Sequence, residues 1–571
     1  MADEELLKNI NDSTINATRH QHDTLSSILH QNGAVRYLHP HLPLPNSPLV
    51  AAAFRRAVPL STYDDYADYI TQMAETSLDH QQPLLSVDPL LCFFYSSGTS
   101  SPRPKLIPYF DSKLSKAASF IAHQGSAAIL RRLFPPRDSV NKIMWFIYGD
   151  NVTTTRGGVK VMAASTYPLQ SGGANWSQLR FIVSPKEVIL GSNVEHQTYC
   201  HLLCGLRNRD LLDAIRAPYA VGLIRAFRVL ESKWEQLCRD LEEGFPSLEI
   251  SDGETRNSVV EVLGGPQPEL AERVRVVFEG QNWGGIVSKL WPNIRYVRCV
   301  TTGSMEQYYP KLKYYAGEIP LLGGDYFASE CCVGINLDIM EPPDKTRFVL
   351  LPTAAYFEFL PFDMNEAEVS TGRETVDIAG VEVGKMYEVV VTTYRGFYRY
   401  LLGDVVRVVG FDNFSPLVEF VMRAPKGPGE IITERDLMAA MRSVQLVFED
   451  VMATQITEFA SFLDMELTPK QLKVFIEARE GSRLMQEESV VALRRCCSSL
   501  EDGLGGIYKV QRDRGETGPL MLSVVKPSSF DRLSQVAIAN GASASQYKPP
   551  KIIRNREIVH FLEGSTLVTI S

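Results

Sequence analysis

The 571-residue sequence lacks any apolar run of the roughly 20 residues that a membrane-spanning helix needs. Its acidic, polar beginning lacks the pattern of a secretory signal and argues against a transit peptide. The nine cysteines are odd in number and have no disulfide-framework spacing, which is typical of a reducing compartment. We therefore expect a cytoplasmic protein without a membrane segment.

The sequence also lacks an excess of positive charge. It has 58 Lys and Arg against 67 Asp and Glu, a net charge of −9, so no general attraction to nucleic acid or to an anionic membrane is expected. The hydrophobic and charged fractions, 44% and 22%, are ordinary for a globular protein. A chain of this length is too long to fold around one hydrophobic core, so we expect several domain-sized units. We also expect a monomer.

Three common catalytic motifs are missing. There is no G-x4-G-K-[ST] loop, no G-x-G-x-x-G after a strand and no G-x-S-x-G, which argues against phosphate-loop NTPases, Rossmann enzymes and serine hydrolases. One H-x3-C-H-x2-C run, His196 to Cys204, has a spacing that could suit a metal. Its neighbours are the apolar residues of a core helix, and free cysteines are commonly buried, so a structural role is the favoured interpretation.

The pattern of elements predicts an α/β fold with two unequal parts. Helices are expected over residues 112–133 and 434–447, residues 196–244 read as helices alternating with short turns, and strand signals dominate residues 321–408. Several of these strands are continuous apolar runs, typical of a sheet covered on both faces. The Pro- and Gly-rich residues 423–430 predict a hinge between a large domain, residues 1–422, with sheets flanked by helices, and a smaller α+β domain, residues 431–571.

A loop of small hydroxyl residues follows the apolar run at residues 89–94. Its members include Ser96, Ser97, Gly98 and Thr99, and two basic residues stand just beyond them. Free backbone N–H groups and hydroxyls in such a turn suit a phosphate chain. An ordinary solvated loop has the same composition, so the loop alone leaves both interpretations open.

Three further positions carry chemistry that complements a phosphate loop. Tyr326 could stack on a flat ring, and Glu330 could hold a hydroxyl or Mg²⁺. Asp404 follows a glycine at a predicted strand end, where a carboxylate can accept hydrogen bonds from a ribose diol. Lys548 stands in a polar loop and could place a positive charge on phosphate. Each could equally be a surface or turn residue when taken alone.

The order of these motifs resembles that of a known family. A Ser/Thr/Gly loop is followed by Tyr-x-x-Ser-Glu, then Tyr-Arg-x-x-x-Gly-Asp, a hinge and a C-terminal lysine. The sequence is similar to the plant auxin-responsive acyl-acid amido synthetases, members of the adenylate-forming superfamily of firefly luciferase. Further matching pieces cover nearly the whole chain, at residues 291–293, 302–305, 334–338, 356–359 and 546–548.

The resemblance implies a two-step reaction that uses ATP and Mg²⁺. A carboxylic acid attacks the α-phosphate of ATP to give an acyl-adenylate and pyrophosphate. The amine of an amino acid then attacks the activated carbonyl, which releases AMP and forms an amide. The implied partners are therefore a hormone-type carboxylic acid and a free amino acid.

The resemblance also implies a role for individual residues. Lys548 and Glu330 are the implied catalytic residues, and Glu330 is also the implied ligand of Mg²⁺. Residues implied to bind the nucleotide are Ser96, Ser97, Thr99, Asp325, Tyr326, Phe327, Ala328, Ser329, Glu330, Asp404, Arg423 and Lys548. The acid pocket is expected between the helix at residues 112–133, residues 157–166 and the region near residue 333, with His123, Ser165, Thr166, Val333 and Ile335 as candidates.

The sequence departs from the family pattern at three places. Phe327 and Ala328 replace small residues, the phosphate loop continues Ser-Pro-Arg-Pro, and the hinge segment after Arg423 is shortened. Our leading hypothesis is an ATP-dependent acyl-acid amido synthetase, with indole-3-acetate as the first candidate acid. A jasmonate- or benzoate-type synthetase, an acyl-CoA ligase and a catalytically weak hormone-binding member are the alternatives.

Overall fold

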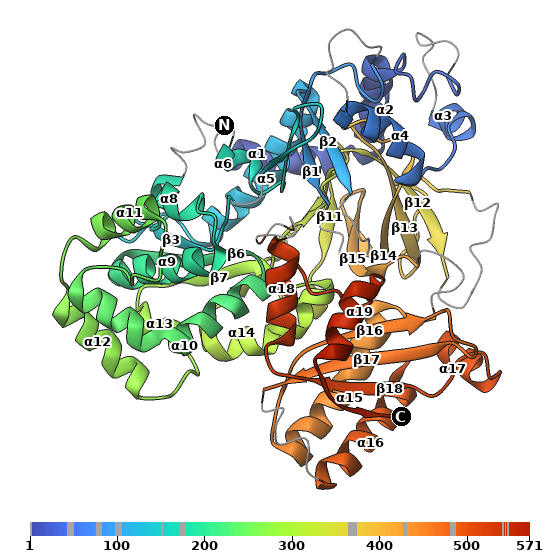
Figure 1. Ribbon diagram of the computed structural model, residues 1–571. Helices are drawn as coiled ribbons and strands as arrows, with labels where there is room; N and C mark the ends of the chain where they lie inside the picture. Colours follow the sequence, from blue (N-terminus) through green and yellow to red (C-terminus); the bar gives the residue numbers. More distant parts are fainter. Residues whose placement is uncertain are drawn as a thin grey trace.

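The computed structural model describes residues 3–42, 51–75, 83–96, 105–149, 152–170, 179–363, 374–425, 431–479, 487–539, 542, 544 and 547–571. Over this part of the chain the predicted mixed α/β class is confirmed, with four sheets flanked by helices. Residues 426–430 of the predicted hinge lie outside the described residues. The helices and strands after residue 431 gather around their own sheet, shown in orange and red in Figure 1.

The largest sheet has seven strands, and each of them pairs antiparallel with its neighbours. Its order is β12 (Tyr356–Phe362), β13 (Met386–Thr392), β14 (Tyr400–Asp412), β15 (Ser415–Arg423), β11 (Phe348–Leu350), β10 (Cys332–Ile335) and β9 (Tyr326–Phe327). A second sheet has the order β2 (Leu106–Phe110), β1 (Leu90–Tyr95), β5 (Lys160–Met162) and β4 (Thr153–Thr154). The predicted phosphate loop lies between β1 and β2 in the sequence.

A third sheet is parallel throughout, with the order β3 (Lys142–Trp145), β6 (Leu212–Tyr219), β7 (Tyr296–Val300) and β8 (Leu321–Leu322). The expectation of only helices and turns over residues 196–244 is wrong, because β6 crosses this region. Asp213, Arg216 and a proline interrupt the apolar pattern of β6, and strand partners on both sides compensate for its weak local signal. The carboxyl ends of these strands meet at one edge, where parallel sheets commonly bind ligands.

The remaining sheet belongs to the C-terminal part and has the order β16 (Ile456–Asp464), β17 (Gln471–Ala478), β18 (Met521–Val525) and β19 (Thr566–Ile570). Its helices are α15 (Glu434–Met452), α16 (Glu487–Gly503), α17 (Gly506–Asp513), α18 (Ser529–Ala539) and α19 (Arg556–Gly564). Helix α15 begins at Thr433, whose side chain accepts from the backbone N–H of Asp436 while the Asp436 carboxylate accepts from that of Thr433. The expected helix at 434–447 is therefore present and extends by more than a turn.

The described helices among the first 321 residues pack around the second and third sheets and against the seven-stranded sheet. They are α1 (Asp3–Ile15), α2 (Ala17–Asn32), α3 (Ala51–Ala57), α4 (Asp64–Glu75), α5 (Lys113–Leu133), α6 (Tyr167–Gln170), α8 (Lys186–Ile189), α9 (Val194–Arg207), α10 (Ala220–Glu243), α11 (Gly253–Leu263), α12 (Pro268–Glu279), α13 (Ile286–Leu290) and α14 (Tyr309–Ala316), with a 3-10 helix η3 (Gly303–Tyr308) before α14. Ser112 caps α5 as its Oγ accepts from the N–H of Ser115 at 3.3 Å. Cys200 and Cys204 on α9 are fully buried, consistent with the core interpretation of that helix.

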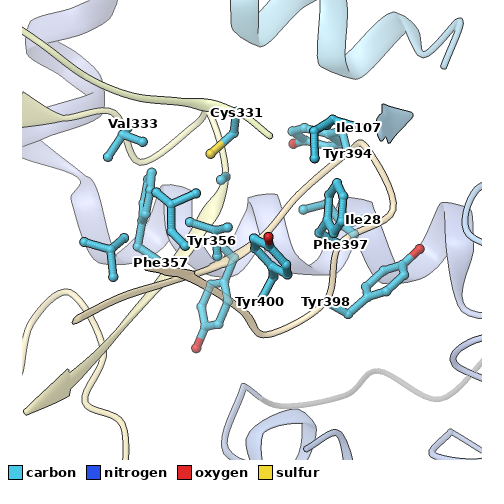
Figure 2. Packing of buried hydrophobic residues seen from close by; sticks show 14 of the residues in the cluster. Ile28, Ile107, Cys331, Val333, Tyr356, Phe357, Tyr394, Phe397, Tyr398 and Tyr400 are labelled. Carbon is cyan, nitrogen blue, oxygen red and sulfur yellow. The ribbon is translucent and has the colours of Figure 1, made fainter. Parts of the chain in front are cut away.

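One core joins α2, β2 and the seven-stranded sheet. Figure 2 shows residues from these elements, including Ile28, Ile107, Val333 and Tyr356, packed against one another. The buried hydroxyl of Tyr398 donates to the carbonyl of Leu85 at 2.7 Å, so the polar end of this ring is satisfied. This packing fixes the sheet that carries Tyr326, Asp404 and Arg423 against the phosphate-loop strands.

Candidate functional site

A cavity of about 1830 Å³ opens where the sheets and the C-terminal part meet. Its lining includes predicted site residues that are far apart in the sequence: Ser96, His123, Ser165, Asp325, Tyr326, Phe327, Ala328, Ser329, Glu330, Asp404, Arg423 and Lys548. Ser97 and Thr99 lie outside the described residues. Predicted site residues between positions 96 and 548 therefore line a single cavity.

Asp404 is the centre of a buried polar cluster on three strands. One carboxylate oxygen accepts from the hydroxyl of Tyr326 at 2.8 Å, and the other lies 2.7 Å from Nη1 of Arg423. Asp404 and Arg423 stand directly opposite each other in the β14–β15 register. Burial, followed by the charge of Asp404, raises the pKa of Tyr326, so this hydroxyl remains a donor. The cluster holds the carboxylate of Asp404 at the cavity wall, where it can accept hydrogen bonds from a ribose diol.

Glu330 lies in the same wall, 9% exposed. Burial raises the pKa of its carboxyl, while Arg423 and Lys105 act in the opposite direction. No cluster of three or more metal-ligating side chains occurs in the described part of the chain. A single carboxylate still fits Mg²⁺, which in nucleotide sites commonly takes one or two protein carboxylates and completes its coordination with phosphates and water.

Lys548 comes from the C-terminal part and reaches the cavity across the boundary between the two parts. Its Nζ lies 4.0 Å from the ring centroid of Tyr219, the last residue of β6. A lysine over an aromatic face is held by the ring quadrupole and keeps its ammonium available to an anion. The side chain is half-buried, so a phosphate in the cavity could contact it directly.

The described ends of the phosphate loop are tied together. The backbone N–H of Ser96 donates to the carbonyl of Lys105 at 2.9 Å, and the N–H of Lys105 donates to Oγ of Ser96 at 3.2 Å. Nζ of Lys105 lies 4.8 Å from the ring of Tyr63. These bonds place Ser96 and Lys105, the residues that flank the loop in the sequence, side by side at the cavity wall.

Residues 325–329 are positioned by hydrogen bonds to neighbouring elements. Asp325 accepts from Oγ of Ser126 at 2.6 Å and from Nη2 of Arg298 at 2.9 Å, so its carboxylate ties α5 to β7. The Ser329 carbonyl accepts from Nη1 of Arg395. These contacts indicate that Asp325 orients the segment, and its predicted contact with the nucleotide stays a prediction.

The predicted acid-pocket residues separate into two groups. His123 and Ser165 line the cavity, and Oγ of Ser165 is buried without a hydrogen-bond partner among the described residues. Thr166, Val333 and Ile335 are fully buried and lie outside the cavity lining. Thr166 donates to the Tyr148 carbonyl at 3.3 Å, and the other two side chains pack in hydrophobic cores. These three side chains support the wall from behind.

His123 on α5 faces the cavity beside Phe327, with ring centroids 4.6 Å apart in an edge-on arrangement. Burial lowers the pKa of His123, so its imidazole favours the neutral form. A neutral imidazole can donate or accept a hydrogen bond without adding charge. His123 therefore suits a polar substituent of a substrate as well as its ring.

Sequence reasoning assigned no role to several residues that line the cavity: Trp145, Arg216, Tyr219, Thr302, Gly303, Ser304, Glu388 and Arg395. Residues 302–304 follow the parallel strand β7. Their position at the carboxyl end of a strand could have indicated a ligand-binding role from the sequence. Arg216 and Tyr219 carried no such signal, because β6 itself was not recognised.

The fold defines the class of protein. A solved 2-hydroxyisobutyryl-CoA ligase is similar in fold, with a TM-score of 0.50 over 96% of this chain and 90% of that one, at 12% identity. The GH3.15 acyl acid amido synthetase is similar with a TM-score of 0.85 over 99% of this chain and 96% of that one, at 30% identity. The chain thus has the fold of the GH3.15 acyl acid amido synthetase, and it shares its architecture with the CoA ligase.

The chain belongs to the GH3 family. Models of the family's N-terminal, central and C-terminal domains match residues 6–321, 348–423 and 435–557. A probable indole-3-acetic acid-amido synthetase of Oryza sativa subsp. japonica is 50% identical over 68% of this chain and 82% of its own length. A 4-substituted benzoates-glutamate ligase of Arabidopsis thaliana is 33% identical over 97% and 96%. The predicted family, the acyl-acid amido synthetases, is confirmed, and with it a ligase class that joins acids to amino acids.

Proposed function

We propose that this protein adenylates a carboxylic acid with ATP and transfers the acyl group to an amino acid in the cavity described above. One observation carries the proposal: Ser96, Glu330, Asp404, Arg423 and Lys548 line one volume. A nucleotide needs a phosphate turn, a carboxylate for ribose and positive charge near the reacting phosphate, and these residues supply each of them.

We assign a role to each of these side chains from its position in the cavity. Asp404 accepts from the ribose hydroxyls, oriented by Tyr326 and Arg423. Lys548 stabilises the negative charge that develops on the α-phosphate as the acid attacks, because its ammonium enters a partly desolvated site. Glu330 would hold Mg²⁺, which neutralises phosphate charge when bound.

Indole-3-acetate and benzoates are the first acids to test, because relatives with those names match most of the chain. We propose a cytoplasmic location, in keeping with nine cysteines that are all free and buried. That the protein is a monomer stays a prediction. Among the described residues, none of the helices is apolar over a length that could cross a membrane. The predicted binding of jasmonate-type acids remains an alternative for the same site.

Pyrophosphate release measured against a panel of acids, each with and without amino acids, tests the activity. Acid-dependent release without an amino acid supports adenylation, and an amide product with one supports the second step. Absence of ATP turnover with every acid, while one of them still binds, would leave only the hormone-binding alternative.

Lys548→Ala is the sharper test of the mechanism. We expect a loss of about 100- to 1000-fold in the rate of pyrophosphate release, because a charged group aimed at the transition state is removed. Acid binding, measured by calorimetry, should be nearly unchanged. The matched control is Lys509→Ala, an exposed lysine of α17 in the same part of the chain. Lost acid binding in Lys548→Ala would refute the assigned role.

A further inference from the structure

The cavity has a second end beyond the nucleotide residues. It is formed at the carboxyl ends of β3 and β6, and its apolar wall comprises Ile143, Trp145, Ile147, Leu179, Phe181 and Ile182. Such a wall suits the body of an organic acid. Arg216 is set into this apolar surface, and Trp145 stands beside it in the β3–β6 register.

The guanidinium of Arg216 is poorly paired. Its Nη2 donates to the hydroxyl of Tyr296, and its charge lies 5.4 Å from that ring's centroid. Nε is buried without a hydrogen-bond partner, and across the described residues no carboxylate forms an ion pair with Arg216. An arginine offers five N–H donors, and a partly buried arginine is normally matched by an anion. At this position an acceptor is missing from the described part of the protein.

The neighbouring charged groups do not neutralise Arg216. Arg298 stands beside Arg216 in the β6–β7 register and is paired with Asp325 at 2.9 Å. Arg131, also in the cavity wall, is paired with Asp3 at 2.7 Å. The carboxylates of Asp325 and Asp3 are thus already paired, and the guanidinium of Arg216 is available to a bound anion.

The position of Arg216 indicates which part of a substrate it faces. It precedes Tyr219, which lies under Lys548, by three residues on β6. These correspond to at most about 10 Å of strand, because the β6–β7 register shifts between the two residues. This spacing places Arg216 about the length of a small acid away from the reacting phosphate. The carboxylate that reacts with ATP must lie at the Lys548 end, so the far end of the same acid lies near Arg216.

We propose that Arg216 binds a second anionic or strongly accepting group at the far end of the acid. This inference rests on the proposed function and refines it: the preferred acid carries a carboxylate, hydroxyl or keto group opposite its reacting carboxylate. An unsubstituted indole would leave Arg216 without an acceptor. The orphan hydroxyl of Ser165 and the neutral imidazole of His123 add two further polar groups for such an acid.

The test uses acids that differ only at the far end: phenylacetate, 4-hydroxyphenylacetate and 4-carboxyphenylacetate. Pyrophosphate release without an amino acid isolates the first step. We expect the wild type to prefer the 4-carboxy acid, and Arg216→Met to reduce its kcat/KM relative to phenylacetate by about ten- to a hundredfold, as expected for a lost charge-assisted hydrogen bond. Arg275→Met is the matched control, because Arg275 is a partly exposed arginine of α12 that is paired with Glu242.

Tyr296→Phe provides a second variant in case Arg216→Met does not fold. It removes the hydroxyl that orients Arg216 and retains the ring, so the same preference should fall by a smaller factor. Equal use of the three acids, unchanged by either variant, would overturn the proposal while leaving the amido synthetase activity intact. No pyrophosphate release with any acid would instead overturn the proposed function.

A carboxylate could also come from the amino acid substrate. If Arg216→Met raises the KM for the amino acid and leaves the first step and its acid preference unchanged, the assignment of Arg216 to the acid is wrong. If the change is confined to the first step, the assignment to the acid is supported.

Discussion

Glu388 on β13 lies in the cavity wall close to Asp404. Burial and then the charge of Asp404 raise the pKa of Glu388 to about 7. The proposed nucleotide site therefore contains the carboxylate of Asp404, which is paired with Arg423, and beside it the carboxyl group of Glu388, which resists ionisation. A ligand that brings phosphate charge into this cavity meets less repulsion while Glu388 holds its proton.

This shift predicts a pH dependence of stability. Between the unfolded pKa of about 4.3 and the folded value of about 7, the folded protein binds a proton that the unfolded chain has lost, so stability falls as pH rises through this interval. Glu388→Gln removes that dependence. We expect the Tm of the wild type to fall relative to that of the variant between about pH 5 and about pH 8.

Thermal unfolding across that pH range measures the difference. Glu382→Gln, an exposed residue of the turn before β13, should run parallel to the wild type. Parallel curves for Glu388→Gln as well would show that Glu388 does not carry the shift.

Arg399 joins several elements at the turn before β14. Its φ of 47° is uncommon for a residue other than glycine. Its side chain donates to Glu358 of β12 at 2.8 Å and to the carbonyls of Arg55 at 2.6 Å and Val58 at 2.7 Å. This buried pair thus fixes the end of α3 against the sheet that carries Asp404. The family motif that contains Arg399 has a structural basis here.

Arg399→Leu should reduce the free energy of unfolding by about 3–5 kcal/mol, because it leaves Glu358 buried without its cation. Urea unfolding measures the change. Arg407→Leu, which breaks the more exposed pair with Glu419, is the matched control, with an expected cost of about 0–1 kcal/mol. Comparable losses in the two variants would contradict the role assigned to the buried pair.

At the scale of the whole molecule, one carboxylate connects the two parts of the chain. Glu458 of β16 accepts from the hydroxyl of Tyr308 and from Nε2 of Gln307 at 3.1 Å, both on η3. It also accepts from Nζ of the fully buried Lys551, three residues beyond Lys548. A second contact joins α10 to α18, where Arg228 lies 3.3 Å from Asp531. Figure 1 shows α18 on the side of the C-terminal part that faces the N-terminal helices.

The Glu458 contact should therefore stabilise the arrangement in which Lys548 reaches the cavity. Tyr308→Phe removes one donor across the boundary and keeps the Lys551–Glu458 pair intact. We expect pyrophosphate release to slow by about tenfold with acid affinity unchanged, as for the loss of one hydrogen bond to a charged group.

Single-turnover measurement of the first step, with calorimetric acid binding alongside, tests this expectation. Arg442→Ala is the control, because it breaks a largely exposed pair with Glu306 at the same boundary. An unchanged first step in Tyr308→Phe would show that this contact does not control the position of Lys548.

The sequence predicted well those features that depend on local chemistry. The amphipathic pattern of residues 112–133 predicted α5, and the structure adds the caps Ser112 of α5 and Thr433 of α15. The strand β6 was missed because its local pattern is weak and its neighbours in the parallel sheet come from distant parts of the chain. Val333 and Ile335 lie near the predicted pocket in sequence, but the register of β10 turns both side chains into hydrophobic cores.

By itself, the sequence determined the family and the order of the groups that a nucleotide requires, because each motif is a short run whose chemistry is visible without a fold. Only the tertiary structure decided how these groups meet. Residues 96 and 548 are separated by most of the chain, and the sheets and the contact between the two parts bring them to one cavity. Only the tertiary structure likewise shows that Arg216 has no carboxylate partner among the described residues, because the pairing of a cation depends on which carboxylates the packing places beside it.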